Sequence, residues 1–148
     1  MDIFLPYLIV IIPIGVGIGT QLIKFIIFTA KHGWKPEYAF THGHMPSAHT
    51  AFAISLATSI GWYEGLHSGA FAIALAFAFI LIDDAARIRM YMGDQGRYLN
   101  MLVSQLKNDI DESKFPHLKE RVGHRVSEVV VGALVGFLGT VLLISIFA

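Results

Sequence analysis

Long apolar runs alternate with short polar stretches along this sequence. The apolar runs cover residues 3–30, 45–63, 66–82 and 126–148, and among charged residues only Lys24 and Glu128 interrupt them. Segments of about 17–25 residues with few charges are long enough to cross the hydrocarbon core of a bilayer as helices. The pattern predicts an all-α, polytopic membrane helix bundle with about four transmembrane helices, near residues 4–29, 45–62, 66–89 and 126–147.

The largest polar segment, residues 93–123, separates the third predicted helix from the last. It begins with apolar residues at helical spacing, namely Tyr98, Leu99, Leu102, Val103 and Leu106. This spacing is typical of an amphipathic helix lying on the membrane surface. Pro116 breaks the helical pattern before the last apolar run begins.

Composition agrees with a membrane protein. Of the 148 residues, 55% are hydrophobic and only 15% are charged, against about 25% charged in soluble domains. We therefore expect one membrane-embedded domain over residues 1–148. The balanced charge gives no reason to expect nucleic acid as a partner, and a chain without cysteine has neither disulfides nor thiolate chemistry.

Two helices carry glycines at close spacing. They are Gly15, Gly17 and Gly19 in the first helix, and Gly132, Gly136 and Gly139 in the last. Small residues let helix backbones approach closely in membranes. We interpret them as packing positions, which would also allow two copies of the chain to associate as a homo-oligomer.

Basic residues are distributed unequally between the two sides of the predicted bundle. If the helices cross in alternation, the side holding both termini and Glu64 receives no Lys or Arg, and every basic residue except Lys24 falls on the other side. Cytoplasmic loops carry such an excess of positive charge. We expect an integral protein of a bacterial plasma membrane, with both termini outside. The first helix is not expected to be a signal peptide, because Asp2 stands where a basic start is usual.

Polar residues within or at the ends of the helices gather toward this basic side. They are Lys24, Ser47, His49, Asp83, Asp84, Arg87, Arg89, His124 and Glu128. Charged groups at membrane depth are costly unless they pair or line a wet cavity, so their convergence predicts a polar pocket facing the cytoplasm. Snorkelling to the nearest interface is the alternative for Lys24 or Arg87 taken singly.

Three of these segments together resemble a known family. They are His44-Met45-Pro46-Ser47-Ala48-His49, Asp84-Ala85-Ala86-Arg87-Ile88-Arg89, and Gly123-His124-Arg125-Val126-Ser127-Glu128. In this order they are similar to the motifs of the divergent branch of the type 2 phosphatidic acid phosphatase superfamily, which includes acid phosphatases and vanadium haloperoxidases. The resemblance spans about residues 21–139. The family's Arg-Pro after the first Lys has no equivalent here, and the segment from Asp84 to Arg89 stands in for the missing Arg.

The resemblance implies a lipid phosphatase that works without metal or cofactor. His124 would attack phosphorus to form a phosphohistidine, Glu128 would hold its ring, and His49 would protonate the leaving oxygen. The phosphate would be bound by Lys24, Ser47, Arg89 and Arg87. Asp84 would orient Arg89 or Lys24, and Asp83 would pair with Arg87.

The expected substrate is a phosphorylated lipid held in the bilayer: a phosphatidate, phosphatidylglycerol phosphate, or a prenyl phosphate or diphosphate. Two other functions are compatible with the sequence: a small anion-binding transporter and a catalytically inactive scaffold subunit. We expect His32, His42, His44 and His117 to be loop residues. A metal site at His42, His44 and His49 is a weaker alternative, because no carboxylate accompanies them.

Overall fold

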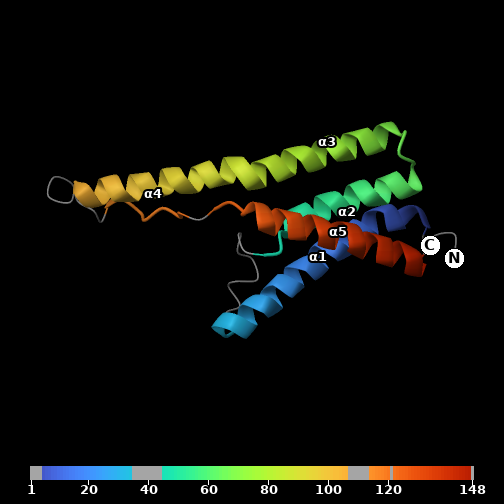
Figure 1. The fold of residues 1–148 in the computed structure, drawn as a ribbon, viewed down its shortest axis with the longest axis horizontal. Coiled ribbons are helices and arrows are strands. Elements are labelled where there is room, and N and C mark those ends of the chain that lie inside the picture. The colour runs from blue at the N-terminus through green and yellow to red at the C-terminus, as the bar shows by residue number, and fades with distance from the viewer. Residues whose placement is uncertain (1–4, 35–44, 107–113, 121, 148) are drawn as a thin grey trace.

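The computed structural model describes residues 5–34, 45–106, 114–120 and 122–147 of the chain. Every regular element in these ranges is a helix, and four of the helices form a bundle from which α4 extends (Figure 1). The predicted membrane helix bundle is confirmed. The elements are α1 (Leu5–His32), α2 (Ala48–Tyr63), α3 (Gly69–Asp83), the π-helical turn η2 (Asp84–Ile88), α4 (Arg89–Gln105) and α5 (Val126–Phe147).

Three helical stretches of the described chain are long and apolar enough to cross a membrane: Tyr7–His32, Gly69–Gln105 and Val126–Phe147. Helix α2 has 16 residues, which corresponds to about 24 Å. It nevertheless lies at the centre of the bundle, in contact with α1, α3 and α5. Its neighbours rather than lipid cover it, so a shorter helix is sufficient there.

Small residues allow α2 to take this central position. The buried set is Thr50, Ala51, Ala53, Ser55, Ala57 and Ser59. On α5, an added Cβ at Gly132 would lie 2.5 Å from the carbonyl oxygen of Ser47, and Gly136 fits as closely against Ala51. These two glycines are packing positions, as predicted. In contrast, an added Cβ at Gly15 or Gly19 would meet nothing within 4 Å.

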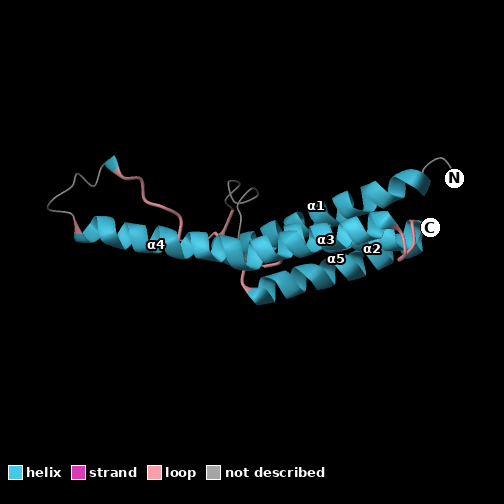
Figure 2. Cartoon of the chain, turned by 90° about the horizontal axis from the view of Figure 1, so that it is seen from above, coloured by secondary structure: helices cyan, strands magenta, loops and turns pink. Residues whose placement is uncertain are grey.

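Helix α3 continues through η2 into α4 as one nearly straight rod (Figures 1 and 2). The rod runs from Gly69 to Gln105 and has 37 residues, or about 55 Å. The predicted amphipathic helix is present as α4, and it begins at Arg89 without a turn after the third membrane helix. A rod of this length exceeds the roughly 30 Å hydrocarbon core, so α4 projects beyond the bundle.

The ends of the helices are defined by local signals in the sequence. Ser68 caps α3 by accepting the N–H of Phe71 at 3.1 Å. Gly65, with φ of 87°, makes the tight turn between α2 and α3 that only glycine adopts easily. Helix α1 begins and α5 ends at the same end of the bundle, opposite to α4 (Figure 1).

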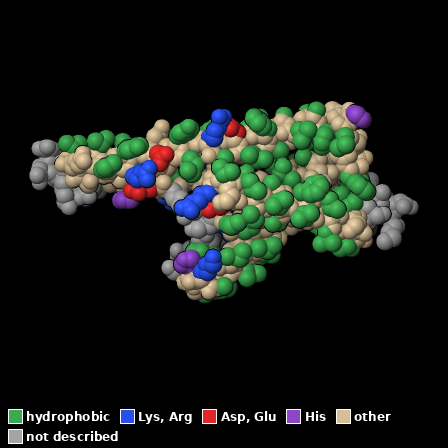
Figure 3. Space-filling view, viewed as in Figure 1, with side chains coloured by type: hydrophobic (Ala, Val, Ile, Leu, Met, Phe, Trp, Pro, Cys, Tyr) green, Lys and Arg blue, Asp and Glu red, His purple; other side chains and the backbone are tan. Residues whose placement is uncertain are grey.

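Charged side chains are absent from most of the bundle surface shown in Figure 3. On that face they lie over the half toward α4 and at the far end of α1, whereas hydrophobic side chains cover the rest of the bundle. The described chain therefore has an apolar end, where α2 turns into α3, and a polar end, where α3 passes into α4.

Candidate active site

A buried histidine and carboxylate form the centre of the polar end. His124 Nδ1 lies 3.0 Å from Glu128 Oε2, and the two residues are 3% and 5% exposed. Glu128 is the third residue of α5, and its carboxylate also accepts the N–H of Arg125 at 3.1 Å. A Glu at this position commonly reaches back to the residue that precedes a helix. The same carboxylate therefore caps α5 and holds the imidazole.

This contact fixes the tautomer of His124. A carboxylate only accepts hydrogen bonds, so Nδ1 must carry the hydrogen and Nε2 must carry the lone pair. Burial lowers the pKa of His124 below its ordinary value, although the hydrogen bond and charge of Glu128 act in the opposite direction. The positive charges of Lys24 and Arg89 lower this pKa further. The neutral, nucleophilic form is thus favoured at neutral pH.

The π-turn η2 brings Asp84 and Arg89 together. Arg89 Nε donates to Asp84 Oδ2 at 2.6 Å across five residues. In an α-helix, residues five apart lie about 140° away from each other around the axis. The wider π-turn places them on one face, which explains how the spacing found in the sequence can work. The guanidinium is oriented by Asp84, as predicted for a supporting residue.

The same turn provides the attachment point of His124. The N–H of Arg89 reaches back to the carbonyl of Asp84, which is one residue further than in an α-helix. The carbonyl of Ala85, which an α-helical turn would pair with Arg89, accepts the N–H of His124 at 3.0 Å. Isolated π-turns of this kind often occur at functional sites.

Ser47 joins the site through its backbone. Its N–H donates to the carbonyl of Glu128 at 3.1 Å, and its hydroxyl accepts from the N–H and the hydroxyl of Thr50 as the cap of α2. The residue is fully buried. Ser47 therefore connects the beginning of α2 to the beginning of α5, and its hydroxyl still has a hydrogen to donate.

Lys24 reaches the site from α1. It is 4% exposed, and its charge interacts with that of Glu128. Lys24 and Glu128 line the same cavity of about 390 Å³. The other lining residues are Ile27, Phe28, Lys31, His32 and Met45. One end of the cavity is thus charged while much of its wall is apolar.

Two of the predicted site residues lie outside the buried cluster. Arg87 is exposed and pairs with Asp83, with 2.8 Å between Nη2 and Oδ2. This is the pairing expected for Asp83, and it directs Arg87 away from the buried cluster. His49 lies in the first turn of α2, two residues after Ser47, and its side chain is exposed.

Among the remaining histidines, one expectation was wrong. His32 is the last residue of α1 and lines the cavity, because the helix extends as far as the cap at Gly33, whose N–H donates to the carbonyl of Thr29. His117 lies in a non-helical segment, as expected. His42 and His44 fall outside the described residues, so the alternative metal site there stays a prediction. In the described part of the chain, no three His, Asp or Glu side chains are grouped closely enough to hold a metal.

The sequence analysis missed Asn100 and the glycines of α4. Gly93, Gly96 and Asn100 lie on the face of α4 that contacts the segment leading to His124. Their spacing of three and four residues is a helical signal that was visible in the sequence. The interpretation of this region as an interfacial helix rested on the apolar residues instead.

Comparison with known families agrees with this architecture. The model of the Divergent PAP2 family matches residues 7–139, a range that includes every residue of the cluster. The chain belongs to this family of membrane proteins.

A bacterial relative has the same extent. The chain is 35% identical to the uncharacterized membrane protein YuiD of Bacillus subtilis (strain 168), and the alignment covers 84% of each chain. No solved structure matches the chain significantly. Together with the three long apolar helices of the described chain, the relative identifies an integral membrane protein.

Proposed function

We propose that this protein is a membrane-embedded lipid phosphatase that hydrolyses a phosphomonoester or diphosphate through a phosphohistidine on His124. The observation that carries the proposal is the buried contact of 3.0 Å between His124 and Glu128, beside a buried Lys24. A neutral imidazole held by a carboxylate is a suitable nucleophile. Buried cations close to it favour the negative charge of a phosphoryl group.

The reaction has two steps. In the first, the lone pair of His124 Nε2 forms a bond to phosphorus while the bond to the lipid oxygen breaks, and His49 gives that oxygen a proton. In the second, His49 takes a proton from water as the water oxygen attacks phosphorus. The bond between phosphorus and nitrogen then breaks, which releases inorganic phosphate and restores neutral His124. Glu128 stabilises the positive charge on the ring in between.

The groups around His124 supply contacts for the phosphate oxygens. Lys24 and Arg89 provide positive charge, and Arg can bind a phosphate through two parallel hydrogen bonds. Ser47 offers its hydroxyl hydrogen at the beginning of α2, where the helix dipole favours anions. Arg87, which the sequence also nominated, contributes at most long-range charge because it is exposed and paired with Asp83.

The cavity supports a lipid as the substrate class. Ile27, Phe28 and Met45 form an apolar wall next to Lys24 and Glu128. An acyl or prenyl chain would contact this wall while its phosphate reaches the charged end. The transporter alternative has less support, because the buried hydroxyls of Ser55 and Thr140, further along the bundle, bond each other inside the packed core.

The proposal is tested by a phosphate-release screen on the purified protein in detergent. Phosphatidate, phosphatidylglycerol phosphate and prenyl phosphates are the substrates, and His124→Ala is the decisive variant. His67→Ala, an exposed histidine at the apolar end, is the matched control and should keep full activity. Release that persists in His124→Ala, or its absence from the unaltered protein with every substrate, would refute the proposed function.

The same assay addresses the expected independence from metal. Activity should survive a chelator, because fixed cations and N–H donors perform the electrostatic work. Vanadate should inhibit by mimicking the trigonal-bipyramidal transition state at His124. Loss of activity in chelator with recovery on adding Mg²⁺ would instead implicate oxygen ligands such as Asp83, Asp84 and Glu128.

We also infer that the polar end faces the cytoplasm and that both termini lie outside. The excess of Lys and Arg on the side of α4 supports this orientation. Reporter fusions at either terminus should be active only if they function outside the cytoplasm. A cytoplasmic reporter that is active at both termini would reverse the orientation.

A further inference from the structure

The segment before His124 lies along a groove on α4. We define the strap as residues 117–120 and 122–124. An added Cβ at Gly96 would lie 2.7 Å from the carbonyl oxygen of Lys119, and one at Gly93 would lie 2.5 Å from that of Glu120. Both distances are too short for any side chain. The strap therefore contacts α4 where glycines leave its backbone uncovered.

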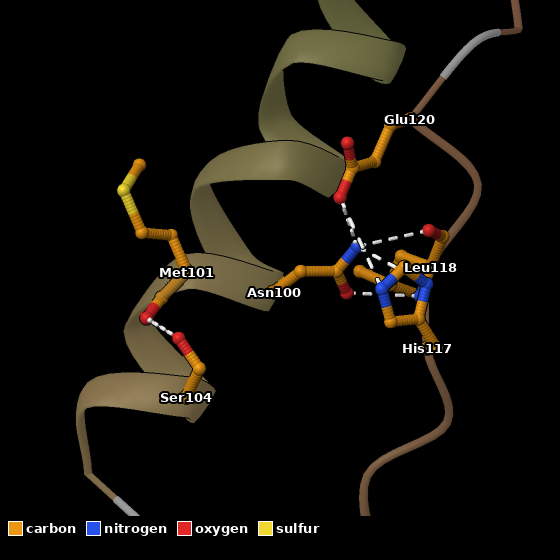
Figure 4. Close-up of polar contacts among 6 residues, drawn as sticks. All are labelled: Asn100, Met101, Ser104, His117, Leu118 and Glu120. Carbon is orange, nitrogen blue, oxygen red and sulfur yellow. Dashed lines mark hydrogen bonds and ion pairs between the residues drawn. The ribbon is translucent and has the colours of Figure 1, made fainter.

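Asn100 holds the far end of the strap (Figure 4). Its Oδ1 accepts the N–H of Leu118 at 3.0 Å, and its Nδ2 donates to the carbonyl of Leu118 at 3.0 Å. The same nitrogen donates to Glu120 Oε1 at 3.0 Å. The side-chain amide thus pairs with one residue of the strap as a neighbouring β-strand would, and it satisfies backbone groups that have no helix of their own.

Further contacts continue from Asn100 to the candidate nucleophile. After Lys119 and Glu120, an added Cβ at Gly123 would lie 2.7 Å from the nitrogen of Met90. The N–H of His124 then donates to the carbonyl of Ala85. The strap runs antiparallel to the rod, and successive strap residues contact successive turns of it.

We propose that Asn100 is a positioning residue that fixes His124 through the strap. Asn100 is 15 residues from Ala85 along the rod, or about 22 Å, so it cannot touch a phosphate bound at His124. Its effect must pass through Leu118, the glycine contacts and the N–H of His124. The catalytic consequence of this proposal rests on the proposed function, but the position of His124 does not.

Hydrogen exchange measures the coupling without any assay of activity. In Asn100→Ala, the amides of Leu118 and His124 should both exchange at least about tenfold faster than in the unaltered protein, because opening of the strap exposes both. Asn100→Gln keeps the donor and the acceptor and should show a smaller increase. Faster exchange at Leu118 with an unchanged amide at His124 would overturn the proposal.

Two glycine variants give an independent test if Asn100→Ala does not fold. Gly96→Ala forces the carbonyl of Lys119 away from α4 and should also increase exchange at His124. Gly19→Ala is the matched control within a helix, because its Cβ would meet nothing within 4 Å, and it should leave exchange at His124 unchanged. Equal exchange at His124 in these two variants would contradict the role of the strap.

Kinetics provide the second readout. With a lipid phosphate as substrate, Asn100→Ala should lower kcat about tenfold and leave KM within about twofold, since the phosphate-binding residues are untouched. An unchanged kcat alongside faster exchange at His124 would overturn the catalytic part. If the unaltered protein releases no phosphate, the proposed function fails, and the exchange experiment still decides whether Asn100 positions His124.

Discussion

The candidate active site lies between two glycine contacts of different kinds. The first, called here the bundle seam, places Gly132 and Gly136 of α5 against the carbonyls of Ser47 and Ala51 of α2. The second, the strap seam, places Gly93 and Gly96 of α4 against the carbonyls of Lys119 and Glu120. His124 follows the strap seam directly, and Glu128 begins the helix that makes the bundle seam.

The two seams differ in how their backbone polar groups are satisfied. In the bundle seam both partners are helices, which pair their own N–H and C=O groups, so close packing of small residues is sufficient. The strap has no helical hydrogen bonds, and the described structure supplies partners from Asn100. A helix can thus be docked by glycine alone, whereas a non-helical segment also needs a polar side chain.

Glu128 connects the two seams, and its substitution should have the largest effect on catalysis. Glu128→Gln keeps an acceptor for the ring N–H but loses the negative charge that stabilises a cationic His124, so we expect kcat to fall by about 10² to 10⁴. The measurement is phosphate release together with circular dichroism, which should show an unchanged fold.

Glu64→Gln is the control for this substitution, since Glu64 is exposed beside the tight turn at the apolar end. It should behave like the unaltered protein. If Glu128→Gln were equally active, the carboxylate would be only a helix cap, and its contact with His124 would have no catalytic meaning.

His49 lies on the α2 side of the bundle seam, and its loss should be less severe than that of His124. His49→Ala should lower turnover of a lipid phosphate about 10²-fold, because general acid catalysis typically contributes that much. A nitrophenyl phosphate leaves as its anion and needs no proton, so the loss should shrink to less than about tenfold.

The control is His124→Ala, which should be inactive toward both substrates and form no phosphoenzyme. The assignment of the two histidines would be reversed if His49→Ala blocked phosphoenzyme formation from the nitrophenyl substrate while His124→Ala allowed it.

Within α5, the glycines of the bundle seam should tolerate substitution unequally. Gly132→Ala places a Cβ 2.5 Å from a backbone oxygen, so the helices must separate, at a cost of about 1–3 kcal/mol in the free energy of unfolding. Gly139→Ala meets the side chain of Val16 at 3.6 Å, an ordinary contact. Its cost should stay below about 0.5 kcal/mol.

Unfolding of both variants in detergent, followed by circular dichroism, compares the two positions. Similar stability of the variants would mean that the close approach of α5 to Ser47 is not required by the fold.

The membrane helices were predictable because their signal is local. Apolar length defines α1, α3 and α5 within a few residues, and the clustering of Lys24, His124 and Glu128 followed from their place near the helix ends. The π-turn was not predictable, since nothing in the residues from Asp84 to Ile88 requires a wider turn. The strap seam depends on contacts between residues about 20 apart in sequence, such as Asn100 and Leu118, and no periodicity reveals these.

The smallest expected effect concerns pH, and it distinguishes the two seams. His124 attacks only when Nε2 is unprotonated, so kcat/KM should fall as pH falls through the pKa of His124. Burial lowers this pKa below the ordinary 6.5, with Glu128 opposing the shift and Lys24 and Arg89 adding to it. The acid limb should therefore lie below pH 6.5. Opening of the strap in Gly96→Ala admits water, which reduces the effect of burial and should move the limb upward by less than about one pH unit. Gly139→Ala packs far from the strap and should leave it in place, and a limb that moves equally in both variants would contradict a specific role of the strap in burying His124.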